Sequence, residues 1–276
     1  MLLPTTVPGV VDGRAAQLLQ PRWSRARGAL SAALVGCPWV IVVLCAVAAA
    51  VAGATGGAMA WAAVGAVLAA VPAVVLTASV RNLVFQPPRW VRAAALGCGA
   101  QLVVGVLPVV GVAAGAGGSG AAVATVVLVV SLGVVVAAVA LASRAVRTLL
   151  TPVSWELGAT PFTVALRARL HDTGMLTGSV SLGTQSIEWA ARQYRAVGHA
   201  SVPFHAVRDV RPTTLPSTAG PMPWLRLSDG STACATPGPA VLVDTDSGAV
   251  TLPVDDPALV VAMLHARLAL WRGGMA

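Results

Sequence analysis

Two long stretches without a charged side chain constrain the fold more than any other feature of the sequence. No Asp, Glu, Lys, Arg or His occurs from Gly28 to Val80, and none from Ala93 to Ser143. Each stretch is about twice as long as the ~20 residues that one helix needs to cross a bilayer. Glycine-rich segments interrupt them at 53–57 and 111–120. The pattern predicts two helical hairpins in a membrane, with spans over residues 31–53, 58–80, 93–114 and 120–142.

The composition agrees with this interpretation. Of the 276 residues, 57% are hydrophobic and only 10% are charged, with a mean hydropathy of +0.80. A soluble domain carries roughly 25% charged residues. Lipid offers no hydrogen-bond partner to the backbone, so a membrane span is either a helix or a strand of a closed β-barrel. The alternation of apolar and polar residues that is typical of a β-barrel is missing from these stretches. The sequence therefore predicts an α-helical membrane bundle whose first partner is the lipid bilayer.

The arginines predict how the chain is threaded. All 18 basic residues are Arg, and the first 150 residues hold nine of them with a single acidic residue, Asp12. These arginines all flank the same ends of the predicted spans, and positive loops stay in the cytoplasm. We therefore expect a multi-pass protein of the plasma membrane with both termini cytoplasmic. Because these arginines form no single patch, the net charge of +8 does not indicate a nucleic-acid partner. The topology-setting residues are Arg14, Arg22, Arg25, Arg27, Arg81, Arg89, Arg92, Arg144 and Arg147.

The predicted domains are a basic N-terminal segment over 1–29, the bundle over 30–148, a linker over 149–160 and a second domain over 161–276. Cleavage of residues 1–54 as a signal peptide stays open as an alternative, because small residues end the first apolar run. The spans contain no ionisable side chain, which argues against an ion-coupled transporter. Their polar residues are expected to join helices by hydrogen bonds; they are Thr77, Gln101, Thr125 and Ser131.

Short alternating segments separated by turn residues predict a β-rich region from about Pro161 onward. A helix follows it, with Asp256 as the N-cap, Pro257 in the first turn and Gly273 at the end. We place Arg267 off the apolar stripe of this helix. The expected strands are Val164–Leu170, Ser179–Leu182, Ile187–Ala191, Val197–Val202, Ala206–Arg211, Trp224–Leu227, Ala240–Val243 and Ala249–Val254.

Three segments carry a resemblance to a known family, namely Val202–Val210, Gly238–Val243 and Val250–Val260. Together they resemble the C-terminal pleckstrin-homology-like (PH-like) domain of actinobacterial multi-pass membrane proteins, a family of unknown function. The likeness covers about Thr177–Trp271. It implies a cytosolic domain tethered to a membrane anchor, and it implies no ligand, cofactor or activity.

No motif predicts a catalytic, cofactor-binding or metal-binding residue. The Gly115–Gly120 glycine pattern lacks the strand and the acidic residue of a dinucleotide site, and Asp244–Gly248 is interpreted as a turn. Arginines of the second domain could instead contact anionic lipid or a partner, or form a solvated face. They are Arg192, Arg195, Arg208 and Arg211. We expect a non-catalytic interaction module that binds a protein, a peptide or a lipid headgroup. The alternative is a small transporter or channel subunit with a regulatory domain.

Overall fold

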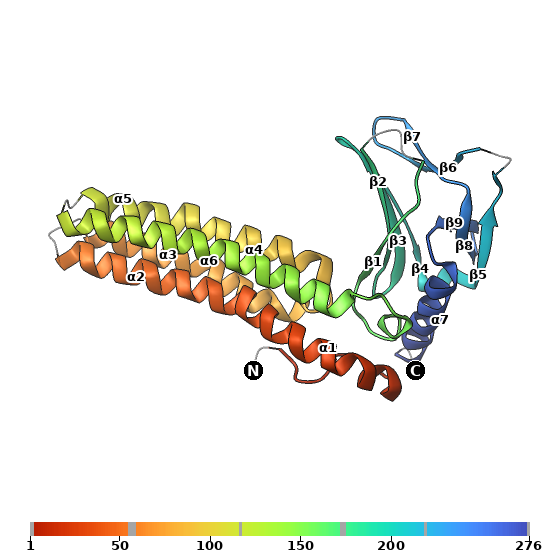
Figure 1. The fold of residues 1–276 in the computed structure, drawn as a ribbon, viewed down its shortest axis with the longest axis horizontal. Helices are drawn as coiled ribbons and strands as arrows, with labels where there is room; N and C mark the ends of the chain where they lie inside the picture. The colour runs from red at the N-terminus through yellow and green to blue at the C-terminus, as the bar shows by residue number, and fades with distance from the viewer. Residues whose placement is uncertain (1–2, 55–58, 116–117, 172–174, 218–219, 275–276) are drawn as a thin grey trace. The chain divides into compact units, whose positions relative to one another are not determined.

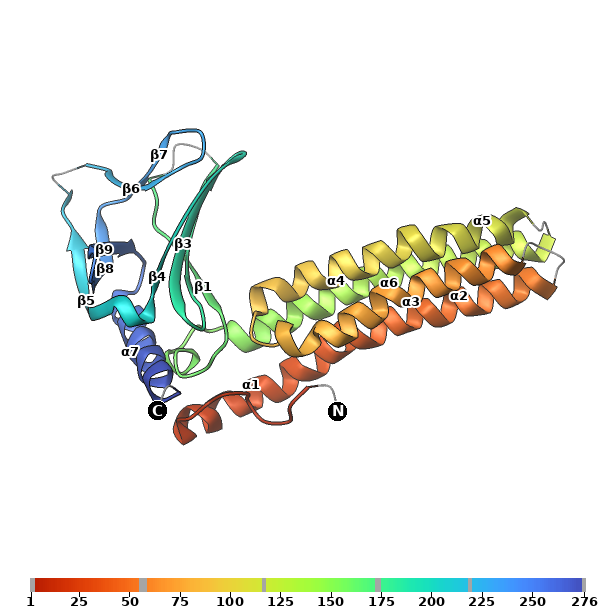
Figure 2. The same ribbon diagram turned by 180° about the vertical axis from the view of Figure 1, so that it is seen from behind.

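A computed structural model describes residues 3–54, 59–115, 118–171, 175–217 and 220–274. The chain forms two compact units. The helical unit comprises Met1–Thr6 and Pro21–Thr151, and the β unit comprises Val7–Gln20 and Pro152–Ala276. Figures 1 and 2 show the helices of the first unit and the curved sheets of the second.

Among the described residues, four helices are long and apolar enough to cross a membrane, which confirms the predicted number. Each extends beyond its predicted bounds into arginine-rich sequence, because Arg favours helix. The first runs through α1 (Gly13–Ser31), the π-helical turn η1 (Ala32–Gly36) and α2 (Cys37–Ala54), and the second is α3 (Met59–Leu83). The third runs through α4 (Pro87–Gln101), the π-helical turn η2 (Leu102–Val106) and α5 (Leu107–Gly115), and the fourth is α6 (Gly118–Leu150). Of the predicted loops around 54–57 and 115–119, residues 55–57 and 116–117 lie outside the described residues. Gly115 ends α5 and Gly118 begins α6, so the described part of the second loop is helical.

Both π-helical turns come just before a proline. Pro38 follows η1, and Pro108 follows η2, each two residues after the turn ends. Proline lacks the N–H that would bond the carbonyl four residues earlier, and in each case that carbonyl lies within the π-helical turn. The wider turn is one way in which a helix accommodates this mismatch. By contrast, α3 continues as α-helix through Pro72.

Glycines bring α3 and the third helix into close contact. A Cβ atom on Gly105 would overlap the methyl group of Ala69, and one on Gly65 would meet the side chain of Val109 at 2.7 Å. Gly111, by contrast, has nothing within 4 Å of its Cβ position. Small residues allow helices to approach closely where the bilayer supplies no hydrophobic drive for association.

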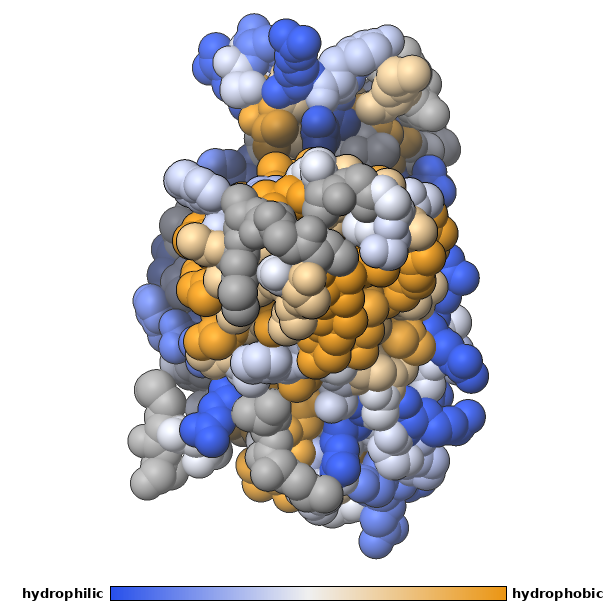
Figure 3. Space-filling view, turned by 90° about the vertical axis from the view of Figure 1, so that its left-hand side faces the viewer, coloured by the Kyte–Doolittle hydropathy of each residue, from blue (hydrophilic) through white to orange (hydrophobic). Residues whose placement is uncertain are grey.

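The outer surface of the helical unit is apolar. Val67 is 66% exposed and Val136 is 69% exposed, and many other aliphatic side chains lie beside them. Figure 3, which looks onto the end of the helical unit where α2 ends and α3 begins, shows hydrophobic side chains around that end. Such a surface is unsuited to water and suits the acyl chains of a bilayer.

The β unit contains nine antiparallel strands within its described residues. Three sheets are formed, with the orders β1-β2-β3-β4, β5-β8-β9 and β6-β7. The predicted β-rich region is thus confirmed, although β7 was missed by the sequence analysis and most strands are longer than expected. Their bounds are Val164–Arg167 (β1), Leu176–Leu182 (β2), Ser186–Gln193 (β3), Ala196–Pro203 (β4), Val207–Leu215 (β5), Met222–Arg226 (β6), Thr232–Ala235 (β7), Gly238–Thr245 (β8) and Gly248–Pro253 (β9).

The final helix α7 (Pro257–Gly273) has the predicted N-cap, because the Asp256 carboxylate accepts a hydrogen bond from the Leu259 N–H at 3.0 Å. The side chain of Arg267, however, is only 1% exposed, so its expected position off the buried stripe was wrong. Its guanidinium donates to five backbone carbonyl oxygens, which satisfies its N–H groups without a carboxylate. These acceptors belong to Leu157, Gly158, Phe162, Leu182 and Gly183.

The segment predicted as a linker, 149–160, ends in ordered and buried structure. A short 3-10 helix, η3 (Trp155–Leu157), contacts α7, and Leu157 and Thr160 are fully buried. The carbonyls of Leu157 and Gly158 are two of the acceptors of Arg267. The chain is therefore fixed to the β unit from within a few residues of the end of α6.

The N-terminal segment also contributes to the β unit, which corrects the expectation of a separate segment over residues 1–29. Val7–Gln20 belongs to the β unit, and the Val7 N–H donates to the Gln20 side-chain oxygen at 3.1 Å. A Cβ on Gly9 would lie 2.7 Å from the ring of Pro161. The first and last parts of the chain thus form one unit.

Candidate binding site

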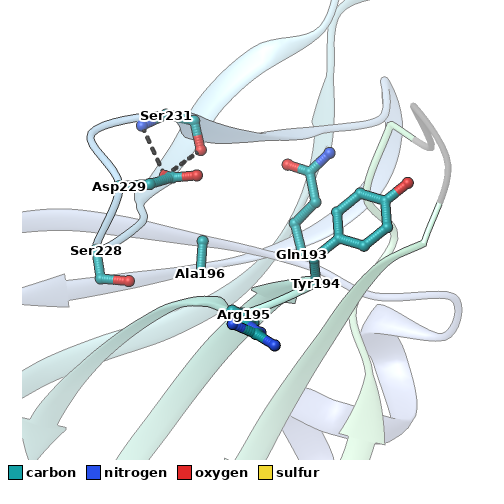
Figure 4. A pocket seen from close by; sticks show the side chains of 7 residues that line it. All are labelled: Gln193, Tyr194, Arg195, Ala196, Ser228, Asp229 and Ser231. Carbon is teal, nitrogen blue, oxygen red and sulfur yellow. Dashed lines mark hydrogen bonds between the residues drawn. The ribbon is translucent and has the colours of Figure 1, made fainter.

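A shallow hollow of about 770 Å³ lies at one end of the β unit, between the β3–β4 turn and the β6–β7 turn (Figure 4). Gln193, Tyr194 and Arg195 line it from the first turn. Ser228, Asp229 and Ser231 line it from the second turn. Backbone and side-chain bonds hold the two turns together, because the N–H of Ser228 donates to the Val197 carbonyl at 3.1 Å and its hydroxyl accepts from the Val197 N–H at 3.2 Å.

The backbone at this end is strained at two positions. Tyr194 has a φ of 51° and Met175 a φ of 56°, and no other non-glycine residue in the described part of the chain has a positive φ. The left-handed region is costly for residues with large side chains. Leu176 pairs with Gln193 across β2 and β3, so both strained residues lie beside the same pair.

The large apolar side chains exposed on the β sheets gather at the same end. Met175 is 71%, Tyr194 66% and Val197 45% exposed, and within the described residues of 152–276 no other large hydrophobic side chain is so exposed. Arg192 pairs with Val197, which places Val197 beside the turn. We call Met175, Arg192–Val197 and Ser228–Ser231 the tip. Exposed apolar side chains that cluster in this way are typical of interaction sites.

The tip carries two cations and one anion. Arg192 donates to the Tyr194 carbonyl at 3.0 Å, and Arg195 makes no hydrogen bond or ion pair within the described chain. The Asp229 carboxylate accepts bonds from the Ser231 hydroxyl at 2.6 Å and the Ser231 N–H at 3.0 Å, drawn as dashed lines in Figure 4. These bonds, the hydroxyl's first, lower the pKa of Asp229 below its ordinary value.

The four arginines singled out in this domain do not form one face. Arg192 and Arg195 lie at the tip, whereas Arg208 and Arg211 lie on β5 in another sheet. Arg208 forms an ion pair with Asp246 at 2.5 Å, and Arg211 forms one with Asp244 at 3.3 Å. Arg192 and Arg195 form no ion pair in the described structure, so an anionic group can reach them without displacing a carboxylate.

The arginines of the helical unit lie where the sequence analysis placed them along the chain. Arg22, Arg25 and Arg27 are on α1, Arg81 is in the last turn of α3, and the others lie within α4 and α6. In Figures 1 and 2, α2 and α5 end, and α3 and α6 begin, at the same end of the bundle, so these arginines belong to the opposite end. Arg89 and Arg92 lie in the first turns of α4, and Arg144 and Arg147 in the last turns of α6.

The polar residues of the spans differ in their contacts. The buried Gln101 amide donates to the carbonyls of Pro38 at 3.0 Å and Ala69 at 2.8 Å, so it joins three helices as expected. Thr77 accepts from the Trp39 indole at 3.3 Å, whereas Thr125 bonds only within its own helix. The Ser131 hydroxyl is buried and has no partner in the described structure.

No three His, Cys, Asp or Glu side chains within the described ranges are placed to hold a metal ion. Comparisons with protein-family models, with curated proteins and with solved structures found no match. The fold defines a four-helix membrane-type bundle with an appended antiparallel β unit. The exposed apolar residues of the tip were missed by the sequence analysis, although Tyr194, the only tyrosine, stands between two predicted strands.

Proposed function

We propose that this chain is an integral membrane protein that anchors a non-catalytic, PH-like interaction module at the cytoplasmic face of the plasma membrane. The observation that carries the proposal is the pairing of an apolar-surfaced bundle with a β unit in which the large apolar side chains exposed on the described sheets, within 152–276, gather at one tip. The module binds a protein, a peptide or an anionic lipid headgroup, and the bundle keeps it at the bilayer.

The proposed threading rests on two features. Four spans return the chain to the side on which it started, and Val7–Gln20 packs within the same unit as Pro152–Ala276. The arginines at one end of the bundle support a cytoplasmic location for both ends of the chain, since positively charged loops are retained on that side. The β-strand order followed by a closing helix supports the PH-like description.

Reporter fusions test the threading. A fluorescent protein that matures only in the cytoplasm is fused after Ala276 in one strain and after Ala54 in another, with alkaline phosphatase at the same positions in two more strains. We expect fluorescence after Ala276 and phosphatase activity after Ala54. The reverse pattern would overturn the orientation, and a soluble chain after cell fractionation would overturn the anchor. Solute flux through proteoliposomes of the purified chain would favour the rival transporter hypothesis.

A further inference from the structure

The tip has the composition of a protein-binding surface. Its exposed side chains include a tyrosine, a methionine and two arginines, which are the residue types enriched in protein interfaces. Tyr and Arg are also the types that most often dominate binding energy. Around them lie the polar side chains of Ser228, Asp229 and Ser231, as in the polar rim of an interface.

The tip lies far from the place where the chain enters the β unit from α6. Arg267 ties the carbonyl of Leu157, seven residues after Leu150 ends α6, to that of Gly183 in the β2–β3 turn. The strand β3 starts at Ser186 beside that turn and has eight residues, so it spans roughly 25 Å at about 3.3 Å per residue. The tip is at its other end, away from the tethered end of the unit.

The charges of the tip favour a protein over an anionic membrane. Two arginines with one opposing carboxylate give little attraction, since each basic residue near an anionic surface contributes only about 1 kcal/mol. The exposed carboxylate of Asp229 is ionised at neutral pH, as is an ordinary Asp side chain, and it would repel lipid phosphates. A single carboxylate of a partner, by contrast, can reach Arg195, which has no ion pair in the described structure.

We propose that the tip binds a protein segment that places an apolar side chain against Tyr194 and its apolar neighbours and a carboxylate against Arg195. The strained backbone of Tyr194 and Met175 holds these two side chains outward before the partner arrives, which reduces the ordering cost of binding. This inference rests on the proposed function only in treating the β unit as a binding module.

The test uses the full chain in nanodiscs of zwitterionic lipid and an array of synthetic peptides. The array holds three matched sets of peptides, all of which contain Leu and Phe. The acidic set adds Asp and Glu, the basic set adds Lys and Arg, and the neutral set adds Ser and Gln. We expect the acidic set to bind best. Tyr194→Ser should weaken that binding by about tenfold or more, the scale of a dominant interface residue. Its control, Val11→Ser, removes a side chain that is 78% exposed elsewhere in the β unit and should have no effect.

A charge reversal gives the sharper result. Arg195→Glu should shift the preference from the acidic to the basic peptide set, whereas Arg272→Glu, at the exposed end of α7, should leave the preference unchanged. A preference that neither Tyr194→Ser nor Arg195→Glu alters would overturn the tip as the site. Binding of the nanodiscs to vesicles rich in phosphatidylserine, abolished by the same two variants, would assign the tip to lipid and overturn the protein proposal. The proposed function would survive both results, since its own test is the membrane location and threading of the chain.

Discussion

The Nε of Arg267 donates a hydrogen bond to the carbonyl oxygen of Gly158 at 2.9 Å, across 109 residues of chain. This bond and four others from the same guanidinium join the last helix to η3 and to the β2–β3 turn. A planar group with five donors suits such a site, whereas the ammonium of lysine carries three donors on one nitrogen. The side chain stabilises the end of the β unit that follows the bundle.

Arg267→Met keeps an apolar stem but leaves the five carbonyl oxygens without their donor. We expect it to destabilise the β unit by about 3 kcal/mol or more, and Arg267→Lys to have an intermediate effect. The measurement is the rate of trypsin cleavage within residues 152–276 of the full chain in detergent. Arg272→Met, at an exposed site, is the control and should leave the rate unchanged. Equal resistance of Arg267→Met and the parent chain would contradict the structural role.

Burial lowers the pKa of Arg267 to about 10, so the guanidinium stays protonated in the folded and the unfolded chain near neutral pH. Arg267 therefore binds the same number of protons in the folded and the unfolded chain between about pH 6 and pH 8. We expect the destabilisation by Arg267→Met to be the same at both ends of that range. A destabilisation that changes steeply within it would show that another titrating group controls this end of the unit.

Gln101→Leu tests the polar contact among the spans. The substitution removes the two hydrogen bonds to Pro38 and Ala69, and bonds of this kind in membrane proteins contribute about 0.6 kcal/mol each, with a maximum near 1.7. We expect a loss of about 1 kcal/mol in the free energy of unfolding in mixed micelles. Thr125→Val is the matched control, because the Thr125 hydroxyl bonds only to Ala121 in its own helix. A loss as large in the control would argue against an interhelical role for Gln101.

Gly105→Ala should disturb the contact between α3 and the third helix, because the new methyl group would overlap that of Ala69. Overpacking of this kind typically costs about 1–3 kcal/mol. Gly111→Ala, which adds the same methyl group where nothing lies within 4 Å, should be neutral or stabilising. Thermal unfolding of the two variants in detergent distinguishes these outcomes, and equal melting temperatures would refute the close contact.

The β6–β7 turn at the tip should lose stability at acidic pH. The bonds from Ser231 lower the pKa of Asp229 in the folded chain, so they stabilise the β6–β7 turn above the unfolded pKa of about 3.9. That contribution is lost as the pH falls through the lower, folded pKa. The amide resonance of Ser231 should therefore titrate below the usual Asp range, and in Asp229→Asn the titration should disappear. A midpoint above that range would exclude the proposed bonds.

The sequence predicted the helical unit more fully than the β unit, for physical reasons. A span must be apolar along its whole length, so the absence of charge from Gly28 to Val80 is sufficient to predict a pair of helices. The first predicted span begins at residue 31, because the arginines before it were taken to end the helix. Arginine ends only the apolar part of a helix, and α1 in fact begins at Gly13.

The misplacement of Arg267 has a different cause. Helical periodicity assigns a charged residue to the solvent side, but five carbonyls from loops distant in sequence make burial of this one favourable. The strand β7 has four residues and gave no alternating pattern of its own. The tip depends on strand register and backbone strain, which bring Met175 beside Tyr194, and neither can be derived from composition.

The participation of Val7–Gln20 in the β unit has a consequence for biosynthesis. A ribosome makes this segment before the four long apolar helices, and it makes the segment's packing partners after them. In the proposed threading, the segment therefore waits, incompletely folded, on the cytoplasmic side of the bilayer. Chaperones and proteases would meet it there during that interval, and a nascent chain arrested before α7 should expose it to cleavage.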